Sequence, residues 1–183
     1  TIQASGSRTG DGYLRNADGA QGADACFGYA PSSACQAAWA AAESMTLEFD
    51  IRVDTGAFLG GQIMGIHSQY SALTGGGSTG IVLIGSPLTS SAGYTEITAN
   101  TWHHIAFVAD YNGGNRVIRC YRNGVQQGVA ESVASFSFDD YPTPTSIGLL
   151  QLSAGFIGNG ALKGGLDNVV LTTRAKYTST FTP

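Results

Sequence analysis

The sequence predicts an all-β protein in which two antiparallel sheets form a sandwich. In the segment TLEFDIRVD (46–54), apolar and polar residues alternate with the period-two pattern of a strand that has one face in water. Further short apolar runs follow along the chain, separated by turn sequences such as YNGGN (111–115) and the Asn-Gly pair at 123–124. Helical segments of the kind that connect parallel strands are missing between these runs, which favours antiparallel pairing.

The predicted strands form one body with a flanking segment at each end. We expect strands at 46–54, 61–68, 80–85, 93–98, 102–110, 116–124, 131–138, 145–153 and 166–173. Residues 1–43 are predicted to be an irregular segment with an edge strand near 12–15 and a short helix near residues 33–43, where alanine is abundant. Residues 174–183 form a C-terminal tail. Because no repeat or linker interrupts the chain, we predict a single domain over 1–183.

Composition argues against two classes of partner. Charged residues make up 12% of the chain, about half of the usual share, and the formal net charge is -4. With only two lysines, Lys163 and Lys176, the sequence predicts no basic patch for nucleic acid or an anionic membrane. No apolar run reaches about 18 residues, so we expect no membrane insertion.

The three cysteines leave the redox state open. Cys26 and Cys35 bracket the loop FGYAPSSA and are a candidate disulfide, with the reduced pair as an equal alternative. Cys120 lies in a predicted strand and is expected to be a small buried hydrophobe. Since no Cys-x-x-Cys motif occurs, the sequence gives no support for a zinc site.

Three stretches carry a resemblance to a known family. They are SMTLEFDIRVD (44–54), the hairpin-like NTWHHIAFVADYNGGNRVIRCYRNGVQQG (100–128) and LKGGLDNVVLTTRAKYTSTFTP (162–183). In this order and spacing they resemble the laminin-G-like branch of the concanavalin A-like jelly rolls, from about residue 44 to the end. The resemblance implies a two-sheet jelly roll. In such a sandwich we expect Trp102 to fill the space between the sheets, with His104 on the same face and His103 on the other.

Asp167 has two interpretations. The resemblance implies that the aspartate of the closing Gly-x-Asp strand helps to bind a structural calcium ion, together with backbone carbonyls near the N-terminus. Calcium prefers such oxygen ligands. Alternatively, the Asp167 carboxylate accepts backbone N–H bonds within the GGLDN turn and binds no ion. The sequence leaves both open.

A catalytic role is not predicted. The same sandwich houses bacterial β-glucanases, which resemble this chain in fold and carry three carboxylates at alternate positions of one strand. Glu48 and Asp50 match the first two positions, but Arg52 stands where the catalytic acid would be. A retaining mechanism needs a nucleophile and an acid that flank one glycosidic bond. We therefore predict that the chain is not an enzyme.

The C-terminal tail provides the first functional hypothesis. Tyr177 and Phe181 lie four residues apart and are predicted to pin the terminus against the sandwich or against a neighbouring subunit. The tail resembles those of laminin-G-like proteins of bacteriophage virions. This implies a structural virion protein, foremost a capsid decoration (cement) protein on the particle surface, with other capsid or tail proteins as partners, homo-oligomer formation and adhesion to a host-surface glycan. We expect the sandwich to fold without residues 175–183.

The alternative function is a secreted, stand-alone carbohydrate-binding module of the lectin type, or else the head of a phage tail fibre or spike. A sugar site needs exposed aromatic rings with polar neighbours. Four tyrosines in or near predicted loops are candidates: Tyr70, Tyr94, Tyr111 and Tyr141.

Overall fold

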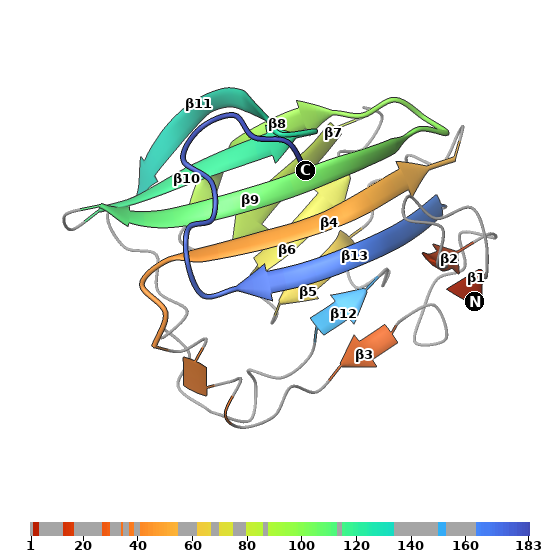
Figure 1. Ribbon diagram of the computed structural model, residues 1–183, viewed down its shortest axis with the longest axis horizontal. Coiled ribbons are helices and arrows are strands. Elements are labelled where there is room, and N and C mark those ends of the chain that lie inside the picture. Colours follow the sequence, from red (N-terminus) through yellow and green to blue (C-terminus); the bar gives the residue numbers. More distant parts are fainter. Residues whose placement is uncertain are drawn as a thin grey trace.

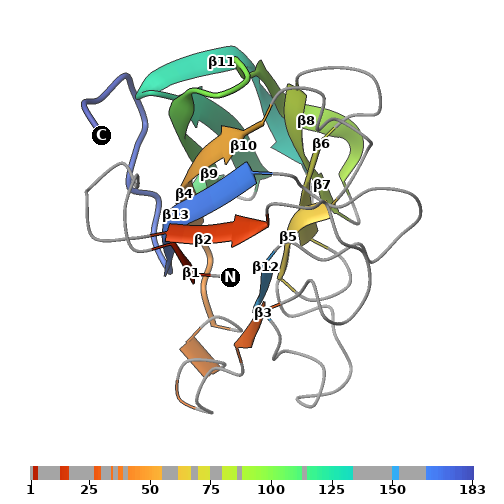
Figure 2. The same ribbon diagram turned by 90° about the vertical axis from the view of Figure 1, so that its right-hand side faces the viewer.

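The computed structural model consists of two antiparallel sheets that lie as separate layers (Figures 1 and 2). It describes residues 2–3, 13–16, 27–29, 34, 37–38, 41–54, 62–66, 70–74, 80–85, 88–112, 115–133, 150–152 and 164–183. The β8 strand lies against β10 and β11 and brings the two layers together. The predicted all-β antiparallel sandwich is therefore confirmed.

The strand order in each sheet places distant parts of the sequence side by side. The seven-stranded sheet contains, in order, β1 (Ile2–Gln3), β2 (Tyr13–Asn16), β13 (Gly164–Thr172), β4 (Met45–Val53), β9 (Trp102–Asn112), β10 (Asn115–Arg122) and β11 (Val125–Val133). The six-stranded sheet contains β3 (Phe27–Tyr29), β12 (Leu150–Leu152), β5 (Gln62–Ile66), β6 (Tyr70–Thr74), β7 (Gly80–Gly85) and β8 (Leu88–Glu96). The closing strand β13 thus pairs with both the early strand β4 and the N-terminal β2.

Several boundaries differ from those expected. The strand predicted at 131–138 begins instead at Val125, because the chain returns directly after the Asn-Gly turn. The β6 strand was not predicted. The strand expected at the edge near 12–15 is β2, and it lies one position inside the edge because β1 pairs with its outer side.

The predicted helix is present in part. Ala34, Ala37 and Ala38 are helical, and the Ala41 amide donates a 3.1 Å hydrogen bond to the Ala37 carbonyl. Residues 41–44 are not helical. Within the described part of the chain, no helix is long and apolar enough to cross a membrane.

The central hairpin has the predicted form. The β9 and β10 strands pair from Asn112 opposite Asn115 to Ile105 opposite Arg122, as expected for strands joined through YNGGN. The next turn, between β10 and β11, has Asn123 at φ 50° and Gly124 at φ 79°. Positive φ at both positions is what a two-residue type I′ hairpin requires, and Asn-Gly is the residue pair that adopts it most readily.

The core lies between the two sheets and is built from alternate residues of the seven-stranded sheet. The fully or almost fully buried apolar side chains on this inner face are Leu47, Phe49, Ile51, Val53, Ile105, Phe107, Ala109, Ile118, Cys120 and Leu166. The rings of Phe49 and Phe107, which come from neighbouring strands, lie 6.4 Å apart between centroids. Burial of these side chains is the main source of stability.

The outer face of the same sheet is also covered. Residues 173–183, here called the strap, leave the end of β13 and run across β4, β9 and β10 (Figure 1). Thr46 and Glu48 on the outer face of β4 bond to the strap and are buried, with Glu48 only 7% exposed. Asp50 on the same face is also buried and bonds to Asn168 of β13. The expectation of a strand with one wet face is wrong for β4, because the strap takes the place of water.

Trp102 does not lie between the sheets. It is opposite Arg52 in the β4–β9 pairing, and the next pair on the same face is Asp50 with His104. That face is the outer one, since Phe49 and Ile51 alternate with these residues and are completely buried in the core. Trp102 is half-buried there. The prediction that Trp102 fills the core is therefore wrong, and it is His103 that points inward.

The strap meets the β10–β11 turn at its backbone. The Phe181 amide donates a 2.9 Å hydrogen bond to the Gly124 carbonyl. A Cβ atom at Gly124 would overlap the Phe181 carbonyl oxygen, whereas nothing lies within 4 Å of the corresponding position at Gly128, which also has a positive φ. Glycine is therefore required at 124 for two reasons, the conformation and the close approach of the strap.

The two glycines give a matched test. Gly124→Ala is expected to lower the free energy of unfolding by more than about 2 kcal/mol, because left-handed strain and the collision with Phe181 add. Gly128→Ala carries the strain alone and is expected to cost roughly 1 kcal/mol. Urea unfolding of both variants measures the difference, and equal losses would show that the strap does not close on Gly124.

Candidate functional site

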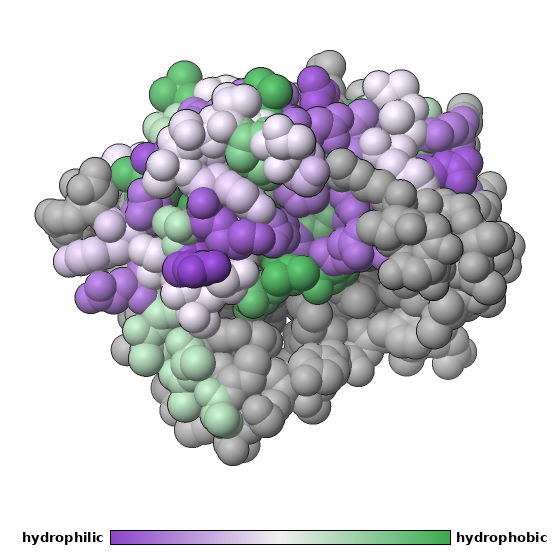
Figure 3. All heavy atoms as spheres, in the orientation of Figure 1, coloured by the Kyte–Doolittle hydropathy of each residue, from purple (hydrophilic) through white to green (hydrophobic). Residues whose placement is uncertain are grey.

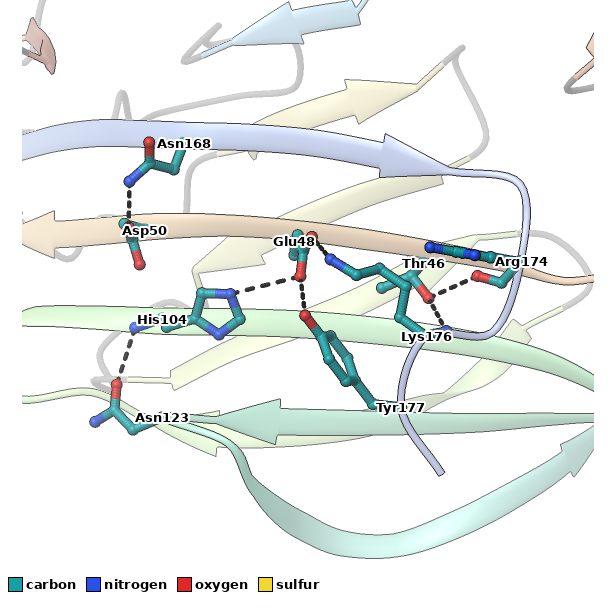
Figure 4. A network of polar contacts seen from close by, with 9 residues as sticks. All are labelled: Thr46, Glu48, Asp50, His104, Asn123, Asn168, Arg174, Lys176 and Tyr177. Carbon is teal, nitrogen blue, oxygen red and sulfur yellow. Dashed lines mark hydrogen bonds and ion pairs between the residues drawn. The ribbon is translucent and has the colours of Figure 1, made fainter. Parts of the chain in front are cut away.

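The polar residues of the outer face lie in one row along β4. Strand alternation places Thr46, Glu48, Asp50 and Arg52 on this face. Figure 4 shows how the strap and the neighbouring strands gather around the row. A buried carboxylate is costly unless it is paired and hydrogen-bonded, so the partners of Glu48 decide the chemistry of this site.

Glu48 is the centre of the network. The Tyr177 hydroxyl donates a 2.7 Å hydrogen bond to Oε2 of Glu48, and the Lys176 ammonium forms an ion pair with Oε1. Nε2 of His104, on the next strand, lies 3.7 Å from Oε2. Two of these three partners belong to the strap. The carboxylate thus holds the strap on the sheet, and the strap neutralises the carboxylate.

Thr46 anchors the beginning of the strap. Its hydroxyl donates a 2.8 Å hydrogen bond to the Arg174 carbonyl and accepts one of 3.0 Å from the Lys176 amide. One threonine therefore satisfies both a donor and an acceptor of the strap backbone. This orients Lys176 and Tyr177 toward Glu48.

Aromatic packing fixes the rest of the strap. The rings of Tyr177 and Phe181 are stacked, with centroids 3.5 Å apart and planes inclined by 6°. Phe181 also meets Tyr121 edge-on at 5.4 Å and His104 at 5.8 Å. Together with Ala175, the two strap rings cover an apolar patch on the sheet that is made of Ala106, Val108 and Tyr121.

The structure places Tyr177 and Phe181 on the chain's own sandwich, which is one of the two predicted alternatives. Their role in assembly with other subunits stays a prediction. The expectation that the sandwich folds without residues 175–183 stays a prediction, but these contacts indicate that the shortened chain would be less stable. Removal of the strap would expose Ala106 and Val108 and would take two partners from the buried Glu48 carboxylate.

The strap network perturbs two titrating groups. Burial acts to lower the pKa of Lys176, but its hydrogen bonds to Glu48 and Tyr177 and the negative charge of Glu48 outweigh burial and raise it. Burial raises the pKa of Tyr177, and the hydrogen bond to Glu48 raises it further. Both groups are therefore held in the protonated form that binds Glu48.

The Asp167 carboxylate accepts a backbone N–H bond, as one of its two predicted roles requires, but it does so within strand β13 and not in a turn. Its Oδ1 accepts a 2.9 Å hydrogen bond from the Asn168 amide, and Asn168 has φ 47° at an irregularity in the β13–β4 pairing. The Asn168 side chain in turn donates to Oδ2 of Asp50 at 2.8 Å. No group of three His, Cys, Asp or Glu side chains with metal-binding geometry occurs among the described residues. Calcium binding by Asp167 with backbone carbonyls stays a prediction.

The two histidines have structural partners. Nε2 of His103 accepts a 3.0 Å hydrogen bond from the Thr98 amide, and its Nδ1 lies 3.3 Å from the side-chain nitrogen of Asn123. The Asn123 side-chain oxygen also accepts from the His104 amide at 2.9 Å. Asn123 in the β10–β11 turn thus holds His103 and His104 at the beginning of β9 in place.

The remaining predicted residues have different outcomes. Cys26, Cys35 and Tyr141 lie outside the described residues. Tyr70 and Tyr94 lie in strands β6 and β8 and not in loops, and Tyr111 is 41% exposed near the end of β9. Cys120 is buried as expected, and desolvation raises the pKa of its thiol to about 12.

Sequence reasoning missed the partners that make this site. It singled out Glu48 as part of an incomplete catalytic row, but it did not connect that carboxylate with Lys176 or with the sheet residue Tyr121. One signal was available, since a tail with two aromatic rings must cover an apolar surface somewhere. Which surface this was depended on the fold.

Comparison with known proteins places the fold in a family. The sequence matches the family model of the concanavalin A-like lectin/glucanases superfamily over residues 14–178. A search of curated protein sequences finds no significant match.

Several solved structures have a similar fold. The CBM40 module of the Ruminococcus gnavus IT-sialidase, in complex with α2,3-sialyllactose, superposes with a TM-score of 0.61 at 12% identity and covers 91% of each chain. A sialidase mutant, NanB of Streptococcus pneumoniae, gives 0.56 at 15% identity over 82% of this chain and 26% of its own. A provisionally assigned carbohydrate-binding protein of Bacteroides ovatus gives 0.53 at 17% identity over 73% of this chain, which spans only 38% of that structure.

Substitutions in the strap test its contribution to stability. Tyr177→Phe keeps the stacked ring and removes only the hydroxyl, so it is expected to cost about 1 kcal/mol. Tyr177→Ala also removes the ring and is expected to cost about 2 to 3 kcal/mol. Thr178→Ala, at an exposed strap position, is the control and is expected to change stability by less than about 0.5 kcal/mol. Guanidinium unfolding of the three variants provides the comparison, and indistinguishable midpoints would contradict the role of the strap.

The strap is also expected to loosen at alkaline pH. Lys176 and Tyr177 have raised pKa values in the folded state, so the native protein holds these protons more tightly than the unfolded chain does. Their contribution to stability is present below the ordinary values of 10.5 and 10.0 and is lost as pH rises through the folded values.

Buried Cys120 titrates in an overlapping range, so the strap must be isolated by difference. We expect the stability difference between the wild type and Lys176→Met, measured by urea unfolding, to be constant from pH 7 to about 9 and to shrink above about pH 10. A difference that grows with pH would contradict the assigned ion pair.

Proposed function

Because the chain belongs to the concanavalin A-like lectin/glucanase superfamily, we propose that it is a carbohydrate-binding module that binds a glycan without cleaving it. The superfamily offers both activities. The observation that favours binding over cleavage is the engagement of Glu48 by the strap and of Asp50 by Asn168 of β13.

Glycoside cleavage by two carboxylates requires that both reach the same bond, at about 5 Å from each other in a retaining enzyme. Glu48 is 7% exposed and Asp50 is 3% exposed. The ammonium and phenol groups of the strap engage the first carboxylate, and the Asn168 amide engages the second. A substrate would have to displace the strap to reach Glu48 and the Asn168 side chain to reach Asp50. The third position of the row is the cation Arg52.

The likeness to solved structures supports the same proposal. The CBM40 module and this chain share a fold over 91% of each chain. That module is described with sialyllactose bound, which makes a glycan the natural ligand class to test here. A composition poor in charge and rich in Gly, Ser and Thr provides uncharged polar groups that can hydrogen-bond to sugar hydroxyls.

A virion role is the second candidate. Its support is the resemblance of the tail to those of phage proteins and the low charge, which reduces repulsion between copies on an ordered surface. The tail no longer supports attachment to other virion proteins, because its aromatic rings pack on the chain's own sheet. Capsid decoration and glycan adhesion are compatible. Recovery of the protein on purified virus particles tests capsid decoration independently of glycan adhesion.

The test of the proposed function is an array of immobilised glycans probed with the full chain, which we expect to bind a subset of the array. Multivalent display compensates for the weak affinity of a single site. The heat-unfolded chain is the control, and oligosaccharides incubated with the folded protein are expected to release no reducing ends. Binding to no glycan would refute the adhesion role, and sugar release would refute the non-catalytic one.

A further inference from the structure

We propose that the part of the outer sheet face beyond the end of the strap is a sugar-binding platform formed by the half-buried Trp102, Arg52 and Asp54, which accepts a neutral pyranose. This inference rests on the proposed glycan-binding function and assigns a site to it. The three residues lie at the ends of β4 and β9 that are farthest from the beginning of the strap.

The sheet register brings the platform together. Trp102 and Arg52 are directly opposite each other on neighbouring antiparallel strands, so their Cβ atoms lie about 5 Å apart on the same face. On the other side of Arg52, β13 contributes Gly165, which has no side chain. Asp54 follows two residues after Arg52 along the chain, so alternation directs it to the same face. An indole and a guanidinium thus lie side by side, with the Asp54 carboxylate two residues further along the chain. On the other side of Arg52, Gly165 separates it from Arg15 of β2.

Exposure separates this platform from the covered half of the face. His104 and Asp50 form the adjacent cross-strand pair and are 9% and 3% exposed. The ring of Phe181, near the end of the strap, lies edge-on against His104. One pair further on, Trp102 and Arg52 are only half-buried. Figure 3 looks onto this face and shows that hydrophilic residues predominate in its described central part.

The residue types match the chemistry of a sugar. An indole offers a flat apolar surface of the size of a pyranose ring, whose axial C–H groups form an apolar patch, and it loses little conformational entropy on binding. Each sugar hydroxyl both donates and accepts hydrogen bonds. The Arg52 guanidinium supplies only donors and the Asp54 carboxylate only acceptors, so together they complement a pair of neighbouring hydroxyls.

Local charge selects a neutral sugar over an acidic one. Around Arg52, the outer face carries three carboxylates, Asp50 and Asp54 on β4 and its continuation and Asp167 directly opposite Asp50 on β13. They outnumber the two arginines, Arg52 and Arg15 of β2, whose Cα atom is opposite that of Gly165. An acidic sugar would bring a further negative charge within reach of all three. We therefore infer that this site prefers neutral glycans, unlike the CBM40 module that is described with sialyllactose.

The test compares variants of the full chain on the glycan array, with lactose and α2,3-sialyllactose as the matched neutral and acidic probes beside other neutral glycans. Trp102→Ala and Arg52→Met are expected to weaken binding at least about tenfold, the loss of one good contact. Trp102→Tyr keeps a stacking ring and is expected to lose less. Arg119→Met is the matched control, since Arg119 lies on the same face but pairs with Asp110 at 3.1 Å on the other side of the covered patch.

Fluorescence gives a second readout. The chain has two tryptophans, so Trp39→Phe leaves Trp102 as the only one, and its emission is expected to shift when a neutral glycan from the array is added. If Trp102→Ala does not fold, the glycan binding of Arg52→Met and the fluorescence shift of Trp39→Phe test the platform instead.

Each outcome separates the site from the function. A wild-type chain that binds no glycan overturns the proposed function and the platform together. Undiminished glycan binding by Trp102→Ala and Arg52→Met overturns the platform alone. A further variant, Tyr111→Ala, tests the exposed tyrosine near the end of β9. If Tyr111→Ala loses glycan binding while Trp102→Ala keeps it, the platform is likewise overturned. Binding confined to sialylated probes overturns the inferred preference for neutral sugars.

Discussion

The buried carboxylate of Glu48 is the constraint on which the outer half of this structure depends. A charge that is almost removed from water must be compensated by partners at short range. The strap supplies a cation and a hydroxyl from two successive residues, Lys176 and Tyr177. Once these are bound, Phe181 is directed over Tyr121 and its backbone reaches Gly124. One carboxylate therefore positions the last eleven residues of the chain.

This arrangement divides a single sheet face into two parts with different chemistry. Where the strap lies, Thr46 and Glu48 of β4 form structural contacts with it. The carboxylate of Glu48, a residue type that suggests catalysis, there binds the C-terminal segment. Beyond Phe181 and His104, the strap ends and Trp102 with Arg52 remains half-buried. In this member of the concanavalin A-like lectin/glucanase superfamily, the two carboxylates at alternate positions of β4, Glu48 and Asp50, are both buried.

Trp102 shows why the sequence misled about this face. The segment HIAFVA in β9 is apolar on both sides, because Ile105 and Phe107 enter the core while Ala106 and Val108 lie beneath the strap. Period-two alternation correctly placed Trp102 and His104 on one face, but it could not say which face was inside. The usual cue, a polar side that must face water, is absent when a non-strand segment covers the second side.

The sequence by itself determined the antiparallel sandwich, the β9–β10 hairpin and the Asn123–Gly124 turn, because strand alternation and turn conformation depend on residues close together in the chain. It also determined that Tyr177 and Phe181 needed an apolar surface. Only the tertiary structure decided that this surface is the outer side of β9 and β10, that Lys176 pairs with Glu48, and that Trp102 lies beside Arg52. Each of these contacts joins residues from different strands or from the strap, and their proximity follows from sheet order and register, which no local pattern specifies.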